Sequence, residues 1–289
     1  MSQISQIIGS IILACVPVMM WGYVFFKKQP EDKRLTFLTF TVGALAVFPI
    51  LFYKSLWTFF PWLNAFRIAE KYEYTYINLS EYVVIPLSVV ITFMLVGVIE
   101  EIMKMIAVKT VDDDDFMSID DCMEFFIIAA LGFSFTENIL YFYNIWIVHG
   151  AQDLILPFLF RSSFSTFAHL LFSGVLGYYY GVAYFAGPVL QDEMKKNRKH
   201  WTRTLHKIFG FRGEKLFHEE KLLEGLIISI TLHAAFNIFL EMNYTYMIVP
   251  FLVLGYMLLN HLFNKKENHK QYGKLLQGVR NTKLRSQEK

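Results

Sequence analysis

Residues 96–108 read VGVIEEIMKMIAV, an apolar run that three ionisable residues interrupt: Glu100, Glu101 and Lys104. On a helix, Glu100 and Lys104 stand four residues apart and can pair, whereas Glu101 points about 100° away. Lysine would then hold one carboxylate while the other faces a cavity. If the run crosses a membrane, each charge costs roughly 2.5–3.5 kcal/mol on insertion scales, so such residues usually mark a functional site. The alternative is a buried ion pair that only fixes helix packing.

Three further apolar segments carry polar residues of the kind that catalysis uses. The segment GFSFTENILYF contains Glu137 and Asn138, and RSSFSTFAHLLFSGVLGYYYG contains His169. In ISITLHAAFNIFLEM, His233 and Asn237 are four residues apart and face the same way. A histidine ligand normally needs a second group to fix its tautomer, and the Asn237 amide can do this for His233. For the segments of Glu137 and His169 the alternative is a hydrogen bond between helices.

Two other features of the segment RSSFSTFAHLLFSGVLGYYYG concern its position and packing. Arg161 lies near the outer end, where a long basic side chain is expected to reach toward the membrane surface. Gly177 and Gly181 form the small-residue pattern that lets two helices approach closely.

The composition places these segments in a membrane protein. The chain has 289 residues, of which 55% are hydrophobic and 18% are charged, below the roughly 25% charged residues of soluble domains. Its mean hydropathy is +0.38. The two cysteines, Cys15 and Cys122, have no metal-type or redox spacing. Apolar runs near 20 residues recur along the chain and predict an all-α, polytopic membrane helix bundle.

Seven transmembrane helices are predicted, with a clear orientation. The spans are 4–26, 35–53, 82–109, 122–148, 158–186, 222–242 and 244–263. The loops on one side hold 22 lysines and arginines and those on the other side hold three, which places the N-terminus outside and the C-terminus in the cytoplasm. The chain then divides into helices 1–2 with an external loop (1–81), a catalytic core of helices 3–7 (82–263) and a basic cytoplasmic tail (264–289).

Two cytoplasmic segments have a composition of their own. The run Asp112–Asp115 predicts a solvated, charge-repelled turn, with a cation site as the alternative. The segment 191–221 is basic and amphipathic, with Trp201 and Leu205 among its lysines. It is expected to lie on the inner membrane surface, attracted to anionic lipid.

The polar residues of the four segments share a depth. At 1.5 Å per residue, they lie about 13–22 Å from the cytoplasmic ends of their helices, as the parts of one site must. Two imidazoles and a carboxylate form the usual ligand set of catalytic zinc, and a further glutamate can accept a proton from water. The spans lack the HExxH arrangement, which excludes a zincin-type metalloprotease.

Four motifs in order resemble those of the PrsW family of intramembrane proteases, a family related to the type II CAAX prenyl proteases. They are Glu-Glu-x-x-Lys at 100–104, Phe-x-x-x-Glu-Asn at 133–138, His169 followed by glycines, and His-x-x-x-Asn at 233–237. They span about half of the chain. In CAAX-type relatives the second motif is Phe-x-x-x-His and the first ends in arginine one residue later, so Glu137 and Lys104 favour the PrsW branch.

The resemblance implies peptide-bond hydrolysis within or next to the membrane. The family's characterised activity is cleavage of a membrane-anchored anti-sigma factor, so a membrane protein substrate and the lipid bilayer are the expected partners, with no nucleic acid. The expected location is the bacterial inner (plasma) membrane, as a multi-pass protein.

The resemblance also assigns roles to individual residues. Glu100 is expected to be the base that activates water, with Glu101 supporting it and Lys104 offsetting part of their charge. Glu137, His169 and His233 are expected to hold a metal, zinc, or to position the water directly, with Asn138 in support. Asn237 is expected to donate to the oxyanion or to orient His233. Two alternatives use the same residues: a proton- or cation-coupled transporter, and an inactive membrane scaffold.

Overall fold

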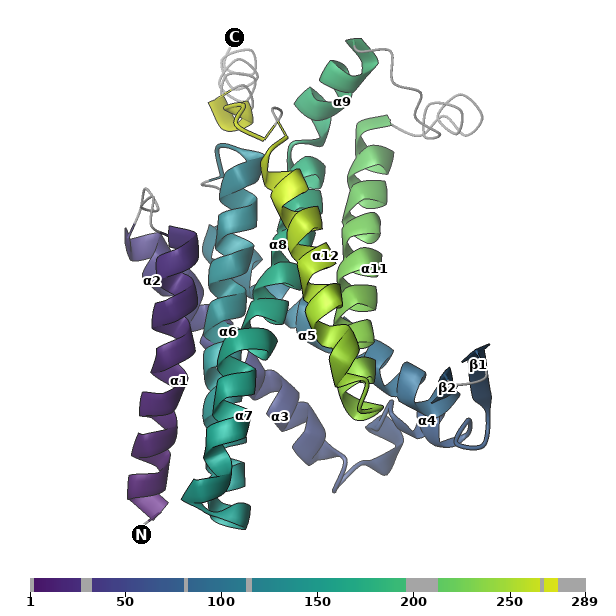
Figure 1. Cartoon of the computed structure of the whole chain (residues 1–289). Helices are drawn as coiled ribbons and strands as arrows, with labels where there is room; N and C mark the ends of the chain where they lie inside the picture. Colours follow the sequence, from purple (N-terminus) through teal and green to yellow (C-terminus); the bar gives the residue numbers. More distant parts are fainter. Residues whose placement is uncertain are drawn as a thin grey trace.

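The computed structural model describes residues 3–26, 33–80, 83–112, 116–195, 213–265 and 268–274, and these are mostly helical (Figure 1). The α-helices are α1 (Gln3–Phe26), α2 (Lys33–Leu45), α3 (Val47–Leu56), α4 (Arg67–Glu70), α5 (Leu87–Asp112), α6 (Ile119–His149), α7 (Ile155–Phe160), α8 (Thr166–Tyr184), α9 (Ala186–Lys195), α11 (Gly213–Glu241) and α12 (Ile248–Phe263). Shorter turns are η1 (Pro61–Leu63), η2 (Ala151–Leu154), η3 (Arg161–Ser165) and η4 (Thr245–Met247). Strands β1 (Tyr76–Ser80) and β2 (Val83–Pro86) form an antiparallel hairpin in which Tyr76 faces Pro86.

Six described segments are long and apolar enough to cross a membrane. They are Gln3–Phe25, Lys33–Leu56, Ile119–His149, Ala151–Tyr184, Gly213–Glu241 and Thr245–Phe263. Each corresponds to a predicted span, which confirms an all-α, multi-pass bundle. The remaining predicted span is α5, whose 26 residues are enough to cross a bilayer. It differs from the six in the three charged residues near its middle, Glu100, Glu101 and Lys104. The orientation stays a prediction.

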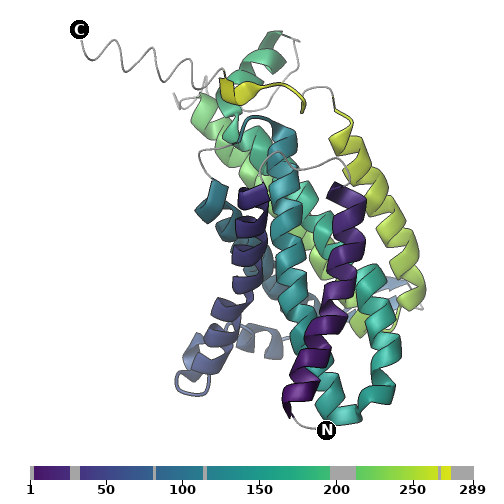
Figure 2. The same ribbon diagram turned by 90° about the vertical axis from the view of Figure 1, so that its left-hand side faces the viewer.

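Helix α6 lies at the centre of the bundle. It packs against α1 and α2 on one side and against α8 on the other, and Figure 2 shows it behind and between α1 and α2. Helix α11 packs against both α5 and α8, and α12 covers α8 (Figure 1). As a result α5, α6, α8 and α11, which carry the four motifs, are neighbours around one core.

The second predicted span consists of two helices, α2 and α3. Proline at position 49 has no N–H for the carbonyl of Leu45, and its ring crowds that carbonyl, so the helix breaks at Ala46. The Thr136 hydroxyl of α6 donates to the carbonyl of Ala44 next to the break, at 2.9 Å. Helix α3 therefore leaves the direction of α2 and crosses toward α5 (Figure 1).

The loop ends of the bundle are tied by local hydrogen bonds. Ser118 caps α6 and forms a capping box with Asp121. Residues 268–274 return to this end, where the Gly273 N–H donates to the Met117 carbonyl at 2.9 Å and His269 contacts Asp120. Of the predicted acidic run, Asp112 ends α5 and 113–115 lie outside the described residues.

The basic segment 191–221 is described only in part. Residues 191–195 belong to α9 and 213–221 form the first turns of α11, while 196–212 lie outside the described residues. Helix α11 thus begins nine residues before the predicted span. The placement of the segment 191–221 on the inner membrane surface stays a prediction.

The predicted close approach at Gly177 and Gly181 is confirmed. A Cβ built on Gly177 would lie 2.9 Å from the Met123 Cα of α6, and one on Gly181 would lie 3.1 Å from the Cys122 Cβ. Both glycines face α6, so the small-residue pattern brings the backbones of α8 and α6 together.

Replacing Gly177 by alanine is expected to destabilise the protein by about 1–3 kcal/mol, because the methyl group overpacks a backbone contact. The thermal unfolding midpoint in detergent measures this. Gly22→Ala in α1 is the matched control, because the one described atom within 4 Å of a Cβ there is Leu131 Cδ2, at 3.7 Å. Equal midpoints for the two variants would contradict the tight crossing of α8 and α6.

Candidate active site

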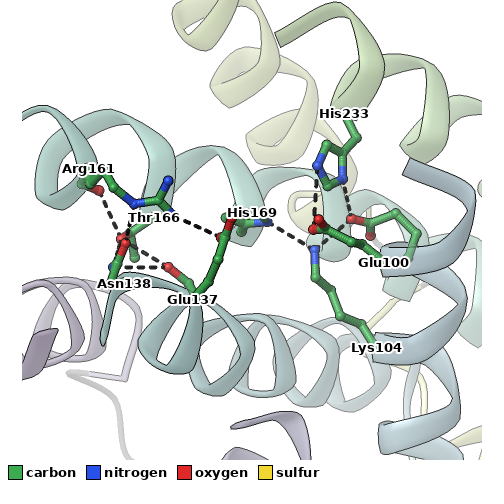
Figure 3. A network of polar contacts seen from close by, with 10 residues as sticks. Glu100, Lys104, Glu137, Asn138, Arg161, Thr166, His169 and His233 are labelled. Carbon is green, nitrogen blue, oxygen red and sulfur yellow. Dashed lines mark hydrogen bonds and ion pairs between the residues drawn. The ribbon is translucent and has the colours of Figure 1, made fainter. Parts of the chain in front are cut away.

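Helices α5, α8 and α11 bring the Glu-Glu-x-x-Lys motif and the two histidines into one cluster (Figure 3). The Lys104 ammonium donates to Glu101 Oε1 at 2.7 Å, an i, i+3 pair on α5 with both side chains fully buried. The predicted pair between Glu100 and Lys104 is wrong. The interior of the bundle lies on the Glu101 side of α5, so Lys104 turns toward Glu101.

Glu101 holds the cluster together through contacts with three helices. Besides Lys104, its Oε1 lies 2.9 Å from His233 Nδ1. Its Oε2 accepts hydrogen bonds from the hydroxyls of Ser173 at 3.2 Å and Ser229 at 3.1 Å. Four donors from three helices thus satisfy both oxygens, which is what a buried carboxylate requires. Glu101 has no oxygen left for a substrate.

Glu100 is the carboxylate that remains available. Its side chain is 15% exposed, and within the described part of the chain its buried Oε2 has no hydrogen-bond partner. The neighbour of this oxygen is His233 Nε2, at 3.6 Å. Because His233 Nδ1 lies against Glu101, a neutral His233 carries its proton on Nδ1 and presents the Nε2 lone pair toward Glu100.

Glu101, rather than Asn237, orients His233. A carboxylate on the far nitrogen is the usual way to fix the tautomer of a ligating histidine. Asn237 lies one turn further along α11, is partly buried, and its side chain has no hydrogen bond among the described residues. The prediction that Asn237 orients His233 is therefore wrong. Among the described residues, the Asn237 amide is available to another partner.

His169 lies between the lysine and the second glutamate. Its Nδ1 is 3.0 Å from Lys104 Nζ and its Nε2 is 2.9 Å from Glu137 Oε2. Phe133, the first residue of the Phe-x-x-x-Glu-Asn motif, lies beneath both, with Lys104 Nζ 4.7 Å from its ring centre. An aromatic face favours a nearby ammonium, so Phe133 helps to hold Lys104 in place.

Arg161 does not reach toward the membrane surface, and that prediction is wrong. Its Nη2 lies 2.8 Å from Glu137 Oε2 and its Nε donates to Asn138 Oδ1 at 2.6 Å (Figure 3). Asn138 is fully buried and also donates to Thr166 Oγ1, at 3.1 Å. The partly exposed Glu137 carboxylate and the buried Asn138 amide offer Arg161 better partners than the interface does.

The sequence held a signal for both Ser173 and Arg161. Positions 161, 165, 169 and 173 recur every four residues, so they share one face with His169. The wide π-helical turn η3 begins at Arg161, and such turns often occur at functional sites. Ser229 could be found in the same way, since it stands one turn before His233.

The candidate metal ligands are Glu100, His169 and His233. One ligand atom from each lies within 4.8 Å of the others. Two imidazoles and one carboxylate match the donor set of catalytic zinc, and the unpartnered Glu100 Oε2 is free to bind a cation. Glu137, the predicted carboxylate ligand, contacts His169 but is not part of this group. A metal would take the place of one of the two present contacts of His169.

Comparison with known proteins agrees with the motifs. A family model described as PrsW family intramembrane metalloprotease matches residues 31–261. Protease PrsW of Geobacillus kaustophilus (strain HTA426) is 27% identical over 173 residues, which cover 58% of this chain and 64% of the relative, slightly under two thirds of its length. No solved structure matches the chain significantly. The matched region contains every motif, so the chain belongs to the PrsW family of intramembrane metalloproteases.

Proposed function

We propose that the protein is an intramembrane endopeptidase that hydrolyses a peptide bond in a membrane-anchored protein. The observation that carries this proposal is the contrast between the two adjacent glutamates. Glu101 is fully satisfied and holds His233, whereas Glu100 is partly exposed and keeps a buried oxygen that has no hydrogen-bond partner in the described part of the chain. Such a carboxylate is suited to accept a proton.

Glu100, His169 and His233 would hold the metal that the family description implies. The donor set fits zinc, which would supply Lewis-acid polarisation of a carbonyl and make a bound water more acidic. Glu101 and Glu137 then act behind the two histidines, since each carboxylate contacts one imidazole nitrogen, at 2.9 Å in both cases. These contacts hold the rings in position.

In the proposed reaction, Glu100 takes a proton from water as the water oxygen bonds to the carbonyl carbon of the substrate. The carbon–nitrogen bond then breaks, and the proton passes from Glu100 to the leaving nitrogen. Glu100 can accept the proton with or without a metal, because a carboxylate has two oxygens and one of them can bind the metal while the other takes the proton. The Asn237 amide lies one turn from His233 and has no hydrogen-bond partner among the described residues, so it can donate to the carbonyl oxygen as this oxygen becomes negative.

The finer part of the proposal concerns the substrate and the location. An anti-sigma factor anchored in the bacterial plasma membrane is the substrate that the family resemblance suggests. The Geobacillus relative supports a bacterial setting. A proton- or cation-coupled transporter would use the same residues, but the family match favours hydrolysis.

The experiment that tests the proposal uses purified full-length protein and membranes from cells that lack its gene. New peptide termini are identified by mass spectrometry after incubation, with and without 1,10-phenanthroline, and the metal content of the protein is measured by elemental analysis. We expect new termini within or next to transmembrane segments, about one equivalent of zinc, and loss of cleavage with the chelator.

The possible results separate the parts of the proposal. Cleavage by a metal-free protein would exclude a role for the metal and support a mechanism in which a glutamate activates the water without it. An anti-sigma factor among the cleaved proteins would support the finer substrate assignment. An absence of new termini, from protein that is folded and loaded with zinc, would contradict the protease function and favour the transporter.

A further inference from the structure

A pocket of about 320 Å³ lies beside Glu100. Helix α3 and the loop after it form one wall and α5 forms the other. Its lining residues are Ile50, Tyr53, Lys54, Trp57, Phe66, Val96, Ile99 and Glu100. The pocket exists because α3 turns away from α2 at Ala46, which leaves room between α3 and α5. Glu100, the proposed catalytic carboxylate, forms part of the lining of this pocket.

The aromatic wall of the pocket is already in place. The Tyr53 hydroxyl donates to the Leu63 carbonyl at 2.6 Å and accepts from the Ala65 N–H at 3.2 Å. Trp57 packs edge-on against Tyr53 and at a tilt against Phe66, with ring centres 5.4 Å apart in both pairs. These contacts tie the loop to α3, so a ligand would enter a pocket that needs little ordering.

Two hydrogen-bond donors lie on this wall, the exposed Lys54 ammonium and the Trp57 indole N–H. Among the described residues, Lys54 makes no ion pair, and the buried Trp57 Nε1 has no acceptor. A buried N–H without an acceptor is costly, so an occupant that brings an acceptor is favoured. The rest of the lining is apolar apart from Tyr53, which the loop already uses, and Glu100 on the opposite wall.

We propose that this pocket is a substrate subsite that binds an acidic side chain close to the peptide bond to be cleaved. This inference rests on the proposed protease function. A carboxylate can accept from Trp57 Nε1 and pair with Lys54, and its methylene groups fit the apolar walls. An apolar side chain would leave the Trp57 N–H unpaired, and a basic one would be repelled by Lys54. Glu100 lines the opposite α5 wall and would repel this carboxylate, so the acidic side chain is expected to bind against the α3 wall, at Trp57 and Lys54.

Binding can be tested separately from catalysis. The probes are three fluorescent synthetic peptides with one apolar transmembrane segment and a short polar flank, identical except for Glu, Gln or Lys at one flank position. Their affinity for the full-length Glu100→Gln protein in detergent is measured by fluorescence anisotropy. We expect the Glu peptide to bind about fivefold more tightly than the Gln peptide, and the Lys peptide to bind most weakly.

Variants of the pocket identify the groups responsible. In the Glu100→Gln background, Lys54→Glu is expected to reverse the order of the Glu and Lys peptides. Trp57→Phe keeps the ring but removes the donor, and is expected to weaken the Glu and Gln peptides while sparing the Lys peptide. Lys71→Glu is the matched control, since it makes the same charge change on the same side of the bundle but outside this pocket. The control is expected to keep the wild-type order.

The outcomes distinguish failure of the pocket from failure of the protease function. Equal affinities for the three peptides, or an order that Lys54→Glu leaves unchanged, would overturn the subsite even if the wild-type protein cleaves. A charge preference that Lys54→Glu reverses, in a protein whose wild type cleaves nothing, would support the pocket and overturn the protease. If Lys71→Glu also reversed the order of the Glu and Lys peptides, the preference would arise from the general surface charge, and this result would overturn the subsite.

Discussion

Replacing Glu100 by glutamine is expected to slow peptide-bond hydrolysis by about 10²- to 10⁴-fold, the usual contribution of a general base. Glutamine has the same shape but cannot take a proton from water, and it is a weaker ligand for the metal that Glu100 is proposed to help hold, so the zinc content of the variant is measured as well. The fold should be unaffected, because Glu100 Oε2 has no hydrogen-bond partner within the described residues that the substitution would remove. The rate of appearance of cleaved termini in the membrane assay and the thermal midpoint in detergent measure the two effects.

Glu241→Gln is the control for this substitution. Glu241 ends the same helix that carries His233, and it is exposed. We expect full activity from this variant. An active Glu100→Gln protein would show that another group activates the water. An inactive one with a much lower thermal midpoint would mean that Glu100 has a structural role, and the assignment of the base would fail.

Replacing Lys104 by methionine is expected to lower the free energy of unfolding by about 3–5 kcal/mol, the usual cost of breaking a buried ion pair. Methionine fills the space but leaves the fully buried Glu101 without its cation. His169 Nδ1 also loses its partner at 3.0 Å. For a protein of this size the thermal midpoint should fall by on the order of 10 °C. Thermal unfolding in detergent, followed by intrinsic fluorescence, measures the change.

Two further variants show whether buried charge is the cause. Lys104→Met combined with Glu101→Gln should be more stable than Lys104→Met alone, because no unpaired charge remains. Lys221→Met removes a lysine from a more exposed pair with Glu224, 2.6 Å long, and should cost only about 0–1 kcal/mol. A Lys104→Met protein as stable as Lys221→Met would contradict the buried pair.

The class of fold and the identity of the site residues follow from the sequence. Long apolar runs must form helices in a bilayer, since each backbone group needs a partner, and six of them are present as such. Glu100, Glu101, His169 and His233 stood out because ionisable residues are rare in such runs. Their order along the chain was enough to suggest the family that the matched region supports.

Only the tertiary structure decided how these residues are divided between roles. The helical period tells which residues of one helix share a face, but not which face turns toward a neighbouring helix. Lys104 could reach either glutamate of α5, and the donors on α8 and α11 placed Glu101 inside, so Glu101 has the lysine and Glu100 is free. Partners from other helices likewise brought Arg161 to Glu137, and Glu100 rather than Glu137 to the two histidines.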